Sequence, residues 1–266
     1  MNELDYIKTS LLNCARVDLY SGKAVLSGEQ KKQFDAIRMR RLGGEPLQYI
    51  FGSVEFCGLS FHVDPRVLIP RPETEIMVEH VLRLFSDKAY QRPLRVLDAG
   101  TGSGCVAVSL ARFSKYVTCD AVDISSEALT VARENARLHG VDGRVSFLQG
   151  DIRKISLPDH SYDVIISNPP YIPDNVIDSL PEEVRCEPRQ ALEGGKDGLD
   201  FYRYFCFAAP RLLIENGLLV CEFWDEQDVP IAALFNEPWR MEFFPDLSGV
   251  KRYFIGHYNN KVPAVS

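Results

Sequence analysis

The sequence predicts an α/β fold with a mostly parallel sheet, preceded by a small α-helical domain. Three observations lead to this prediction. From Leu94 onward, short apolar runs typical of buried strands alternate with segments of helical period. Residues 1–45 show helical period alone. The last two strand candidates are joined only by Pro245–Lys251, which is too short for a crossover helix and therefore predicts an antiparallel pair.

Length and composition set limits on the kind of protein. The 266 residues are 45% hydrophobic and 25% charged, which is ordinary for a globular chain and enough for one full domain and a smaller one. The formal net charge of −7 argues against a protein that coats nucleic acid. Around Glu3 and Asp5 there is no apolar run long enough for a signal peptide or a membrane span. The seven cysteines are scattered without a CxxC pair, so we expect reduced thiols, no metal site and a cytoplasmic protein.

Residues 1–45 are predicted to form the helical domain. Tyr6, Ile7, Leu11, Leu12 and Ala15 recur at helical spacing. A second helix is predicted over Gly28–Leu42, ended by two glycines and a proline. Its expected core positions are Phe34, Ile37 and Leu42. Its basic face consists of Arg38, Arg40 and Arg41, which would face solvent or a partner.

A β-hairpin linker is predicted over residues 46–72, where the period changes from helix to strand. Apolar residues alternate with polar ones around a turn at Cys57-Gly58. The apolar positions are Phe56, Leu59, Phe61 and Val63. The linker ends in Ile69-Pro70-Arg71-Pro72, a stiff lead into a helix. The apolar positions of that helix are Ile76, Met77, Val81, Leu82 and Phe85.

Residues 73–258 are predicted to form the main domain, and residues 259–266 a C-terminal tail. The strand candidates are Leu94–Asp98, Val117–Asp123, Val145–Leu148, Tyr162–Ser167, Leu218–Phe223, Arg240–Phe244 and Arg252–Ile255. The clearest helices are predicted over 125–139, ended by Gly140, and over 199–213. This order predicts a mostly parallel seven-stranded sheet with an antiparallel closing strand and helices on both faces.

A glycine-rich turn follows the first strand of this domain. The run Val96–Gly104 reads VLDAGTGSG and leads from a strand into a helix. Glycines let the backbone approach a ligand closely, and the start of a helix offers free amide groups. Asp123 closes the second strand and Asp151 follows the third. Both acids are therefore predicted at the same crevice, at the carboxyl ends of the strands.

The loop favours S-adenosylmethionine over a dinucleotide. A dinucleotide fingerprint would place its last glycine at position 105, where this chain has Cys105. Asp98 would not help to bind a diphosphate, but it can meet an ammonium group. Asp123 and Asp151 are then predicted to bind the ribose and the adenine. The amides predicted to meet the cofactor carboxylate are those of Gly100, Thr101, Gly102, Ser103 and Gly104.

The fourth strand ends in Asn168-Pro169-Pro170-Tyr171, the most specific signal in the chain. A planar nitrogen is a poor nucleophile because its lone pair is delocalised. The Asn168 side-chain oxygen and the Pro169 carbonyl can accept its two hydrogens, the prolines fix the backbone, and Tyr171 offers a flat surface. Catalysis is then mainly positioning and needs no general base for the attack. The motif predicts methylation of an amide or exocyclic amine, without choosing between glutamine and adenine.

With these motifs the chain resembles the peptide-chain release factor glutamine N5-methyltransferase family of the HemK/PrmC type. The resemblance extends to segments outside the glycine loop, and they are Pro46–Gly52, Leu68–Glu75, Arg185–Leu192 and Gly195–Leu199. Cys186 and Trp224 depart from the family pattern. The resemblance implies a class I, Rossmann-like methyltransferase that uses S-adenosylmethionine.

The implied substrate is the glutamine side-chain amide in the Gly-Gly-Gln motif of class I release factors, whose methylation modulates translation termination. Carried over by position, Gly100–Gly104, Asp123 and Ile152 would bind the cofactor and Asn168–Tyr171 the glutamine. The N-terminal helices would contact the release factor outside its tripeptide. We expect a monomer that does not bind nucleic acid directly.

Other functions remain open from the residues alone. A ribosomal-protein glutamine methyltransferase would share Asn168–Tyr171 and differ in its N-terminal domain. A DNA or RNA exocyclic-amine methyltransferase should show an electropositive surface, whereas this chain is net acidic. A catalytically silent partner-binding domain could keep the fold, although the intact glycine loop and Asn168 argue against it.

Overall fold

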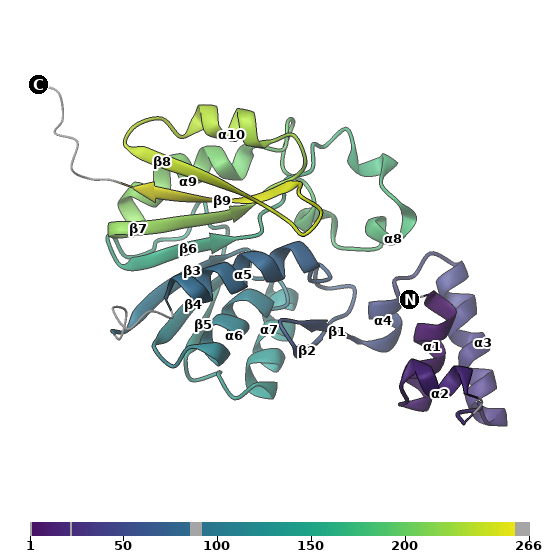
Figure 1. Ribbon diagram of the computed structural model, residues 1–266. Coiled ribbons are helices and arrows are strands. Elements are labelled where there is room, and N and C mark those ends of the chain that lie inside the picture. The colour runs from purple at the N-terminus through teal and green to yellow at the C-terminus, as the bar shows by residue number, and fades with distance from the viewer. Residues whose placement is uncertain (1, 22, 86–91, 259–266) are drawn as a thin grey trace, which may run out of the picture.

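The computed structural model describes residues 2–21, 23–85 and 92–258, so the predicted tail at 259–266 lies outside the described residues. Its main feature is a seven-stranded sheet in the order β5-β4-β3-β6-β7-β9-β8 (Figure 1). Strands β3 to β7 pair in parallel, whereas β9 is antiparallel to both β7 and β8. This confirms the predicted α/β class and its antiparallel closing strand. The strands are β3 (Leu94–Ala99), β4 (Val117–Asp123), β5 (Val145–Gln149), β6 (Tyr162–Ser167), β7 (Leu213–Glu222), β8 (Trp239–Pro245) and β9 (Lys251–Tyr258).

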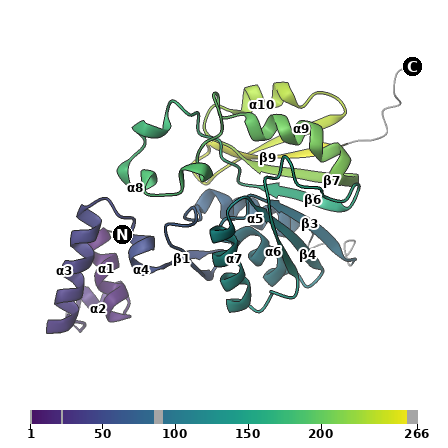
Figure 2. The ribbon, with the colours of Figure 1, turned by 180° about the vertical axis from the view of Figure 1, so that it is seen from behind.

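Helices cover both faces of this sheet (Figures 1 and 2). One face carries α5 (Pro72–Leu84), α6 (Cys105–Phe113) and α7 (Ser126–Leu138), and the other carries α9 (Asp200–Leu212) and α10 (Asp228–Leu234). Neighbouring strand residues point to opposite sides. Val96 lies in the apolar cluster with α5 and α6, and Leu97 lies in the cluster with α9. Burial on both faces explains the continuous apolar runs of the strands.

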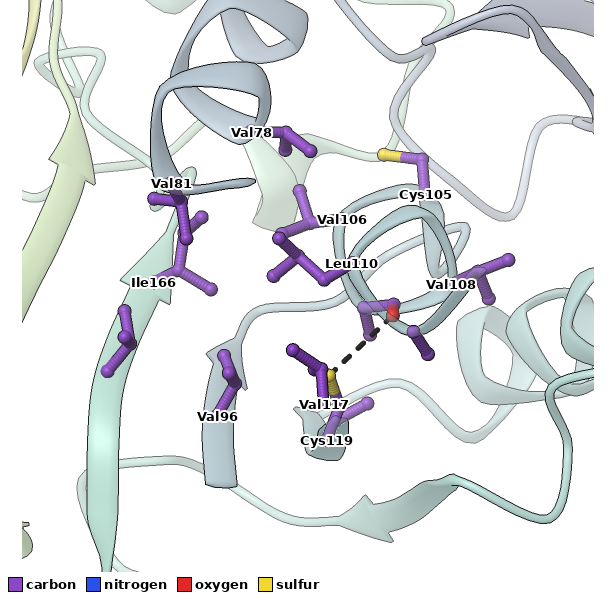
Figure 3. Packing of buried hydrophobic residues seen from close by; sticks show 14 of the residues in the cluster. Val78, Val81, Val96, Cys105, Val106, Val108, Leu110, Val117, Cys119 and Ile166 are labelled. Carbon is purple, nitrogen blue, oxygen red and sulfur yellow. Dashed lines mark hydrogen bonds between the residues drawn. The ribbon is translucent and has the colours of Figure 1, made fainter. Parts of the chain in front are cut away.

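Helix α6, which follows the glycine loop, is buried on every side except at its C-terminal end. Residues 105–111 are all buried, between the sheet and α5 (Figure 3). The Cys119 Sγ donates a hydrogen bond to the Ala107 carbonyl oxygen across 3.6 Å, which ties β4 to this helix. Val78 and Val81 of α5 pack against the same cluster, so Val78 adds to the face predicted for that helix. The glycine loop is therefore anchored at its end by a rigidly packed helix.

The N-terminal part consists of α1 (Glu3–Leu12), α2 (Arg16–Tyr20), α3 (Gly28–Leu42) and α4 (Leu47–Phe51). Three details differ from the prediction. Helix α1 ends at Leu12 because Asn13 adopts φ 47°, so Ala15 lies outside it and caps α2. Leu42 is 75% exposed rather than in a core, because so small a unit cannot cover every apolar position. A strand period was expected from Pro46 onward, but α4 comes first.

Tertiary packing explains α4. The Tyr49 ring is buried in an apolar cluster with Val63 and Val67, and its hydroxyl donates to the Val67 carbonyl oxygen across 2.6 Å. The hairpin that follows is confirmed. Strands β1 (Ser53–Phe56) and β2 (Leu59–His62) are antiparallel, and both turn residues have positive φ, as a two-residue hairpin turn requires. In the described residues no helix is both long and apolar enough to span a bilayer.

The segment between β6 and α9 contains only short elements. They are the 3₁₀ turns Ile177–Ser179 and Arg189–Ala191 and the one-turn helix α8 (Glu182–Arg185). Figure 1 shows this segment beside the N-terminal helices. The Arg41 guanidinium pairs with Glu183 of α8 at 2.7 Å and with Glu3 of α1 at 2.8 Å. The basic face predicted for α3 is thus partly used to join it to its neighbours.

Candidate active site

A cavity of about 270 Å³ opens at the carboxyl ends of β3, β4, β5 and β6. The strand order reverses at this point, because β4 lies on one side of β3 and β6 lies on the other. Such a point in a parallel sheet is where ligands bind. Of the predicted site residues, those in its wall are Gly100, Gly102, Asp123, Asp151, Ile152, Asn168 and Pro170. The others lie behind the wall or beside it, and they are Asp98, Thr101, Ser103, Gly104, Pro169 and Tyr171.

The glycine loop is held in shape by its own hydrogen bonds. The amides of Gly100 and Thr101 both donate to the Val122 carbonyl oxygen, at 2.9 and 3.0 Å. The Gly102 amide donates to Asp123 Oδ2 at 2.8 Å, and the Gly104 amide to Thr101 at 2.8 Å. All four amides therefore already donate hydrogen bonds to acceptors within the chain. The contact expected between the loop amides and a cofactor carboxylate therefore stays a prediction.

Asp98 lies directly under this loop and is 1% exposed. Its Oδ2 accepts hydrogen bonds from the Thr101 hydroxyl at 2.6 Å and from the Ala107 amide at 3.2 Å. Burial nevertheless raises the pKa of this carboxyl group to about 7. A cation brought close to Asp98 would favour the ionised form, which is what the predicted ammonium group would do.

Asp123 and Asp151 differ in how far they are engaged. Asp123 accepts backbone hydrogen bonds from Gly102 and Ser125, and burial raises the pKa of its carboxyl group. Asp151 is paired with Arg153 at 2.9 Å, and this hydrogen bond lowers the pKa of Asp151. Both acids are at the cavity, so the sheet brings them together as predicted. Their roles toward ribose and adenine stay predictions.

Asn168 follows β6 directly and lies in the cavity wall. The preceding Ser167 hydroxyl donates to the Ala99 carbonyl oxygen at 2.6 Å, which joins the ends of β3 and β6. The Asn168 Nδ2 donates to the Thr74 hydroxyl oxygen at 3.0 Å, on the side of α5. Within the described part of the chain, Asn168 Oδ1 accepts no hydrogen bond, so this atom remains for a donor in the cavity.

Tyr171 turns its hydroxyl toward a buried acid that sequence reasoning missed. It donates to Glu222 Oε1 at 3.1 Å, and Glu222 also accepts the Thr74 hydroxyl at 2.5 Å. Burial, followed by the charge of Glu222, raises the pKa of Tyr171 well above its usual range. The ring is half-buried beside the cavity wall. Its predicted role as a flat surface for the substrate stays a prediction.

Asn135 is a second residue that was missed. It is fully buried, and its side chain bonds to both backbone groups of His62, at 2.8 and 3.0 Å, and to the Ser103 carbonyl oxygen at 2.9 Å. One side chain thus joins the hairpin, α7 and the glycine loop. Other wall residues that were not predicted are Arg66, Ile124, Arg153, Gln190, Glu193 and Phe201. The only signal for several of them was that they fall within or beside the segments that carry the family resemblance.

The charges of the wall fit S-adenosylmethionine better than a phosphate-bearing ligand. Four acidic residues line the cavity, and they are Asp123, Asp151, Glu193 and Asp200. Its two basic residues, Arg66 and Arg153, are each paired with an aspartate. A diphosphate would meet repulsion here, whereas ribose hydroxyls and amino groups would meet acceptors. A Cβ placed on Gly100 or Gly102 would touch no atom within 4 Å, so this part of the wall is open to a ligand.

Comparison with known proteins agrees with this geometry. A family model described as "Methyltransferase domain" matches residues 91–241, and one described as "PrmC N-terminal domain" matches residues 2–52. Among solved structures, the hMettl16 catalytic domain bound to an RNA hairpin has a TM-score of 0.61 at 14% identity, over 78% of this chain and 77% of that one. This likeness concerns the fold alone, and it confirms the predicted Rossmann-like architecture.

Relatives among curated proteins match over most of this chain. The release factor glutamine methyltransferase of Geobacter sulfurreducens is 40% identical over 96% of this chain and 88% of its own length. That of Moorella thermoacetica is 45% identical over 82% of this chain and 77% of its own length. Because these relatives are 40–45% identical over most of the chain, and the N-terminal family model matches as well, the chain belongs to the release factor glutamine methyltransferase family.

Proposed function

We propose that this protein transfers a methyl group from S-adenosylmethionine to the side-chain amide nitrogen of the glutamine in the Gly-Gly-Gln motif of a class I release factor. The observation that carries the proposal is the placement of Asn168. Its side chain lies in the cavity wall, where Nδ2 donates a hydrogen bond to Thr74 and Oδ1 can accept one from a substrate. Membership of the family favours a release factor over the alternative substrates.

Each part of the site has a task in this reaction. When bound, S-adenosylmethionine supplies a methyl group on a positively charged sulfur, which is electrophilic without further activation. Asn168 Oδ1 and the Pro169 carbonyl oxygen accept the two amide hydrogens, which draws electron density onto the nitrogen and fixes its orientation. Asp123 and Asp151 bind the nucleoside part. Because no base has to act before the attack, most of the rate comes from positioning, which can remove about 7–11 kcal/mol of a barrier.

The experiment uses the purified protein with labelled S-adenosylmethionine and a class I release factor. We expect label on the glutamine of the Gly-Gly-Gln tripeptide, located by mass spectrometry. Asn168→Ala should reduce kcat by about 100-fold or more, because it removes an acceptor that acts on the reacting group. It should leave the calorimetric affinity for S-adenosylmethionine within a few-fold. Equal losses in both would place Asn168 in cofactor binding instead.

The same assay separates the alternatives. Ribosomal proteins, duplex DNA and transfer RNA are offered under identical conditions, and label on any of them in preference to the release factor would replace the proposal.

We further propose that the protein acts as a monomer in the cytoplasm without binding nucleic acid. Its net charge of −7 and the acidic cavity wall support the absence of nucleic-acid binding. Light scattering of the free protein tests the oligomeric state.

A further inference from the structure

A buried polar chain lies behind Asn168, on the side away from the cavity. Glu222, the last residue of β7, is 2% exposed and accepts the Thr74 hydroxyl at Oε2 and the Tyr171 hydroxyl at Oε1. Its backbone oxygen accepts the Tyr202 hydroxyl at 2.8 Å. Thr74, which is 2% exposed, in turn accepts from Asn168 Nδ2. The chain of donors therefore runs from Asn168 through Thr74 to Glu222.

The direction of this chain decides which end of the Asn168 amide faces the cavity. A threonine hydroxyl has a single proton. While that proton points to Glu222, the Thr74 oxygen is an acceptor and can hold only the NH₂ end of Asn168. The carbonyl end is then turned to the cavity. If the Thr74 proton pointed to Asn168, the amide would bind through Oδ1 and present its NH₂ end, which cannot accept a hydrogen from a substrate amide.

We propose that Thr74 and an ionised Glu222 are positioning residues that hold the carbonyl oxygen of Asn168 toward the substrate amide. This inference rests on the proposed function, since it assumes that Asn168 receives the nitrogen that is methylated. A carboxylate has only acceptor sites, so it forces both hydroxyls to donate to it. A protonated Glu222 has an O–H that needs an acceptor. Thr74 can supply one, and its own proton is then free to turn to Asn168 Oδ1.

The surroundings of Glu222 make this a titratable arrangement. Burial raises the pKa of Glu222 to about 7, the hydrogen bonds from Thr74 and Tyr171 oppose this rise, Glu73 adds to it and Arg71 opposes it. The charged groups that act on it from outside β7 are thus Glu73 of α5 and Arg71 just before α5. Its other neighbours are the uncharged hydroxyl group of Tyr171, the Tyr202 hydroxyl on its backbone oxygen, and Tyr253 as its partner in the β9 register. The acceptor geometry of Asn168 should therefore be lost as the pH falls through about 7.

Thr74 gives the sharpest test because one substitution removes the hydroxyl and keeps the shape. In Thr74→Val, kcat for the release factor should fall roughly 10- to 100-fold, as expected for a mispositioned group, with little change in cofactor affinity. Thr74→Ser restores the hydroxyl and should recover most of kcat. The matched control is Thr130→Val on the exposed side of α7, which should keep wild-type rates. Wild-type kcat in Thr74→Val, or no recovery in Thr74→Ser, would overturn the proposal.

Glu222→Gln tests the charge. Its kcat should be reduced and should no longer rise with pH around 7, whereas the control Glu215→Gln, exposed on the same strand, should keep the wild-type profile. An acidic limb near pH 7 that persists in Glu222→Gln would overturn the proposal and would indicate Asp98, whose pKa is also about 7.

A measurement without substrate separates this inference from the proposed function. The side-chain ¹⁵N–¹H₂ signals of Asn168 can be identified by their loss in Asn168→Ala. In the free wild-type protein they should shift between pH 6 and 8, and in Glu222→Gln they should not. If the shift is present while no release factor is methylated, the positioning residues stand and the substrate is wrong. If methylation occurs and the signals do not respond to pH or to Glu222→Gln, the positioning role is wrong and the function stands.

Discussion

The carboxyl group of Asp98 carries an energetic cost before any ligand binds. Burial raises its pKa to about 7, whereas the group titrates near 4 in an unfolded chain. Between these values the folded state binds more protons than the unfolded state, so Asp98 lowers the free energy of unfolding as the pH rises from about 4 to about 7. A bound cation would offset this loss of stability, because it would pair with the ionised Asp98 carboxylate.

Asp98→Asn should therefore stabilise the ligand-free protein at high pH. Asparagine can still accept hydrogen bonds from Thr101 and Ala107 without carrying a charge. The quantity to compare is the free energy of unfolding of Asp98→Asn minus that of wild type, measured in urea. We expect this difference to be roughly 1–3 kcal/mol larger at pH 8 than at pH 5. Calorimetry should show weaker binding of S-adenosylmethionine.

The control is Asp120→Asn, which removes a buried acid that is paired with Arg95 and accepts the Tyr162 hydroxyl. That variant should be destabilised at pH 8, because it removes the negative charge that pairs with Arg95. A loss of stability in Asp98→Asn at pH 8 would show that the ionised carboxylate serves the fold itself.

At the scale of elements, the glycine loop makes two separate demands. A Cβ on Gly104 would lie 3.0 Å from the Ala132 Cβ, so this glycine allows α6 and α7 to approach. Gly102 has a left-handed backbone with open space beside it, in the cavity wall. Gly104 therefore supports packing, and Gly102 supports access for a ligand.

Gly104→Ala and Gly102→Ala should separate these demands. Gly104→Ala combines backbone strain with a steric conflict and should lower the free energy of unfolding by about 2–4 kcal/mol. Gly102→Ala should cost about 1–2 kcal/mol and weaken S-adenosylmethionine binding more than its loss of stability suggests. Urea unfolding and calorimetry measure both quantities. Equal stability losses in the two variants would contradict this division.

The elements that sequence reasoning found are those whose signal is local. Strands β4 and β6 match their predictions because buried parallel strands are continuous apolar runs. Strand β7 begins at Leu213 rather than at the predicted Leu218, because the Asn216-Gly217 pair inside it looks like a turn. Helix α10 was not predicted, since it is short and contains Pro230.

The site divides in the same way. The acids at strand ends were predicted because parallel strands bring their carboxyl ends to one edge. Thr74 and Glu222 were not predicted as a pair, because 148 positions separate them and 94 separate Thr74 from Asn168. Only the packing of α5 against the end of β7 shows that these polar residues satisfy one another.

At the scale of the whole molecule, the N-terminal helices have a narrow connection to the rest. It includes the Arg41–Glu183 ion pair and a weak contact from Cys186 Sγ to the Gly44 carbonyl oxygen at 3.6 Å. An ion pair this exposed contributes at most about 1 kcal/mol. The segment between β6 and α9, which contains Glu183 and Cys186, also reaches the cavity, because Pro188 and Gln190 lie in the cavity wall. A protein held by the N-terminal helices would therefore lie next to the entrance of the site.

Deleting residues 1–45 should spare the cofactor site and remove activity on the protein substrate. The cut leaves α4 in place, whose Tyr49 packs in the apolar cluster with Val67 near the cavity. We expect S-adenosylmethionine affinity within about threefold of wild type, and kcat/KM for an intact release factor reduced at least 100-fold. A short Gly-Gly-Gln peptide, which has nothing to offer the missing helices, should be methylated at similar low rates by both proteins. If the truncated protein methylates the intact factor at the wild-type rate, these helices contribute to stability and not to recognition.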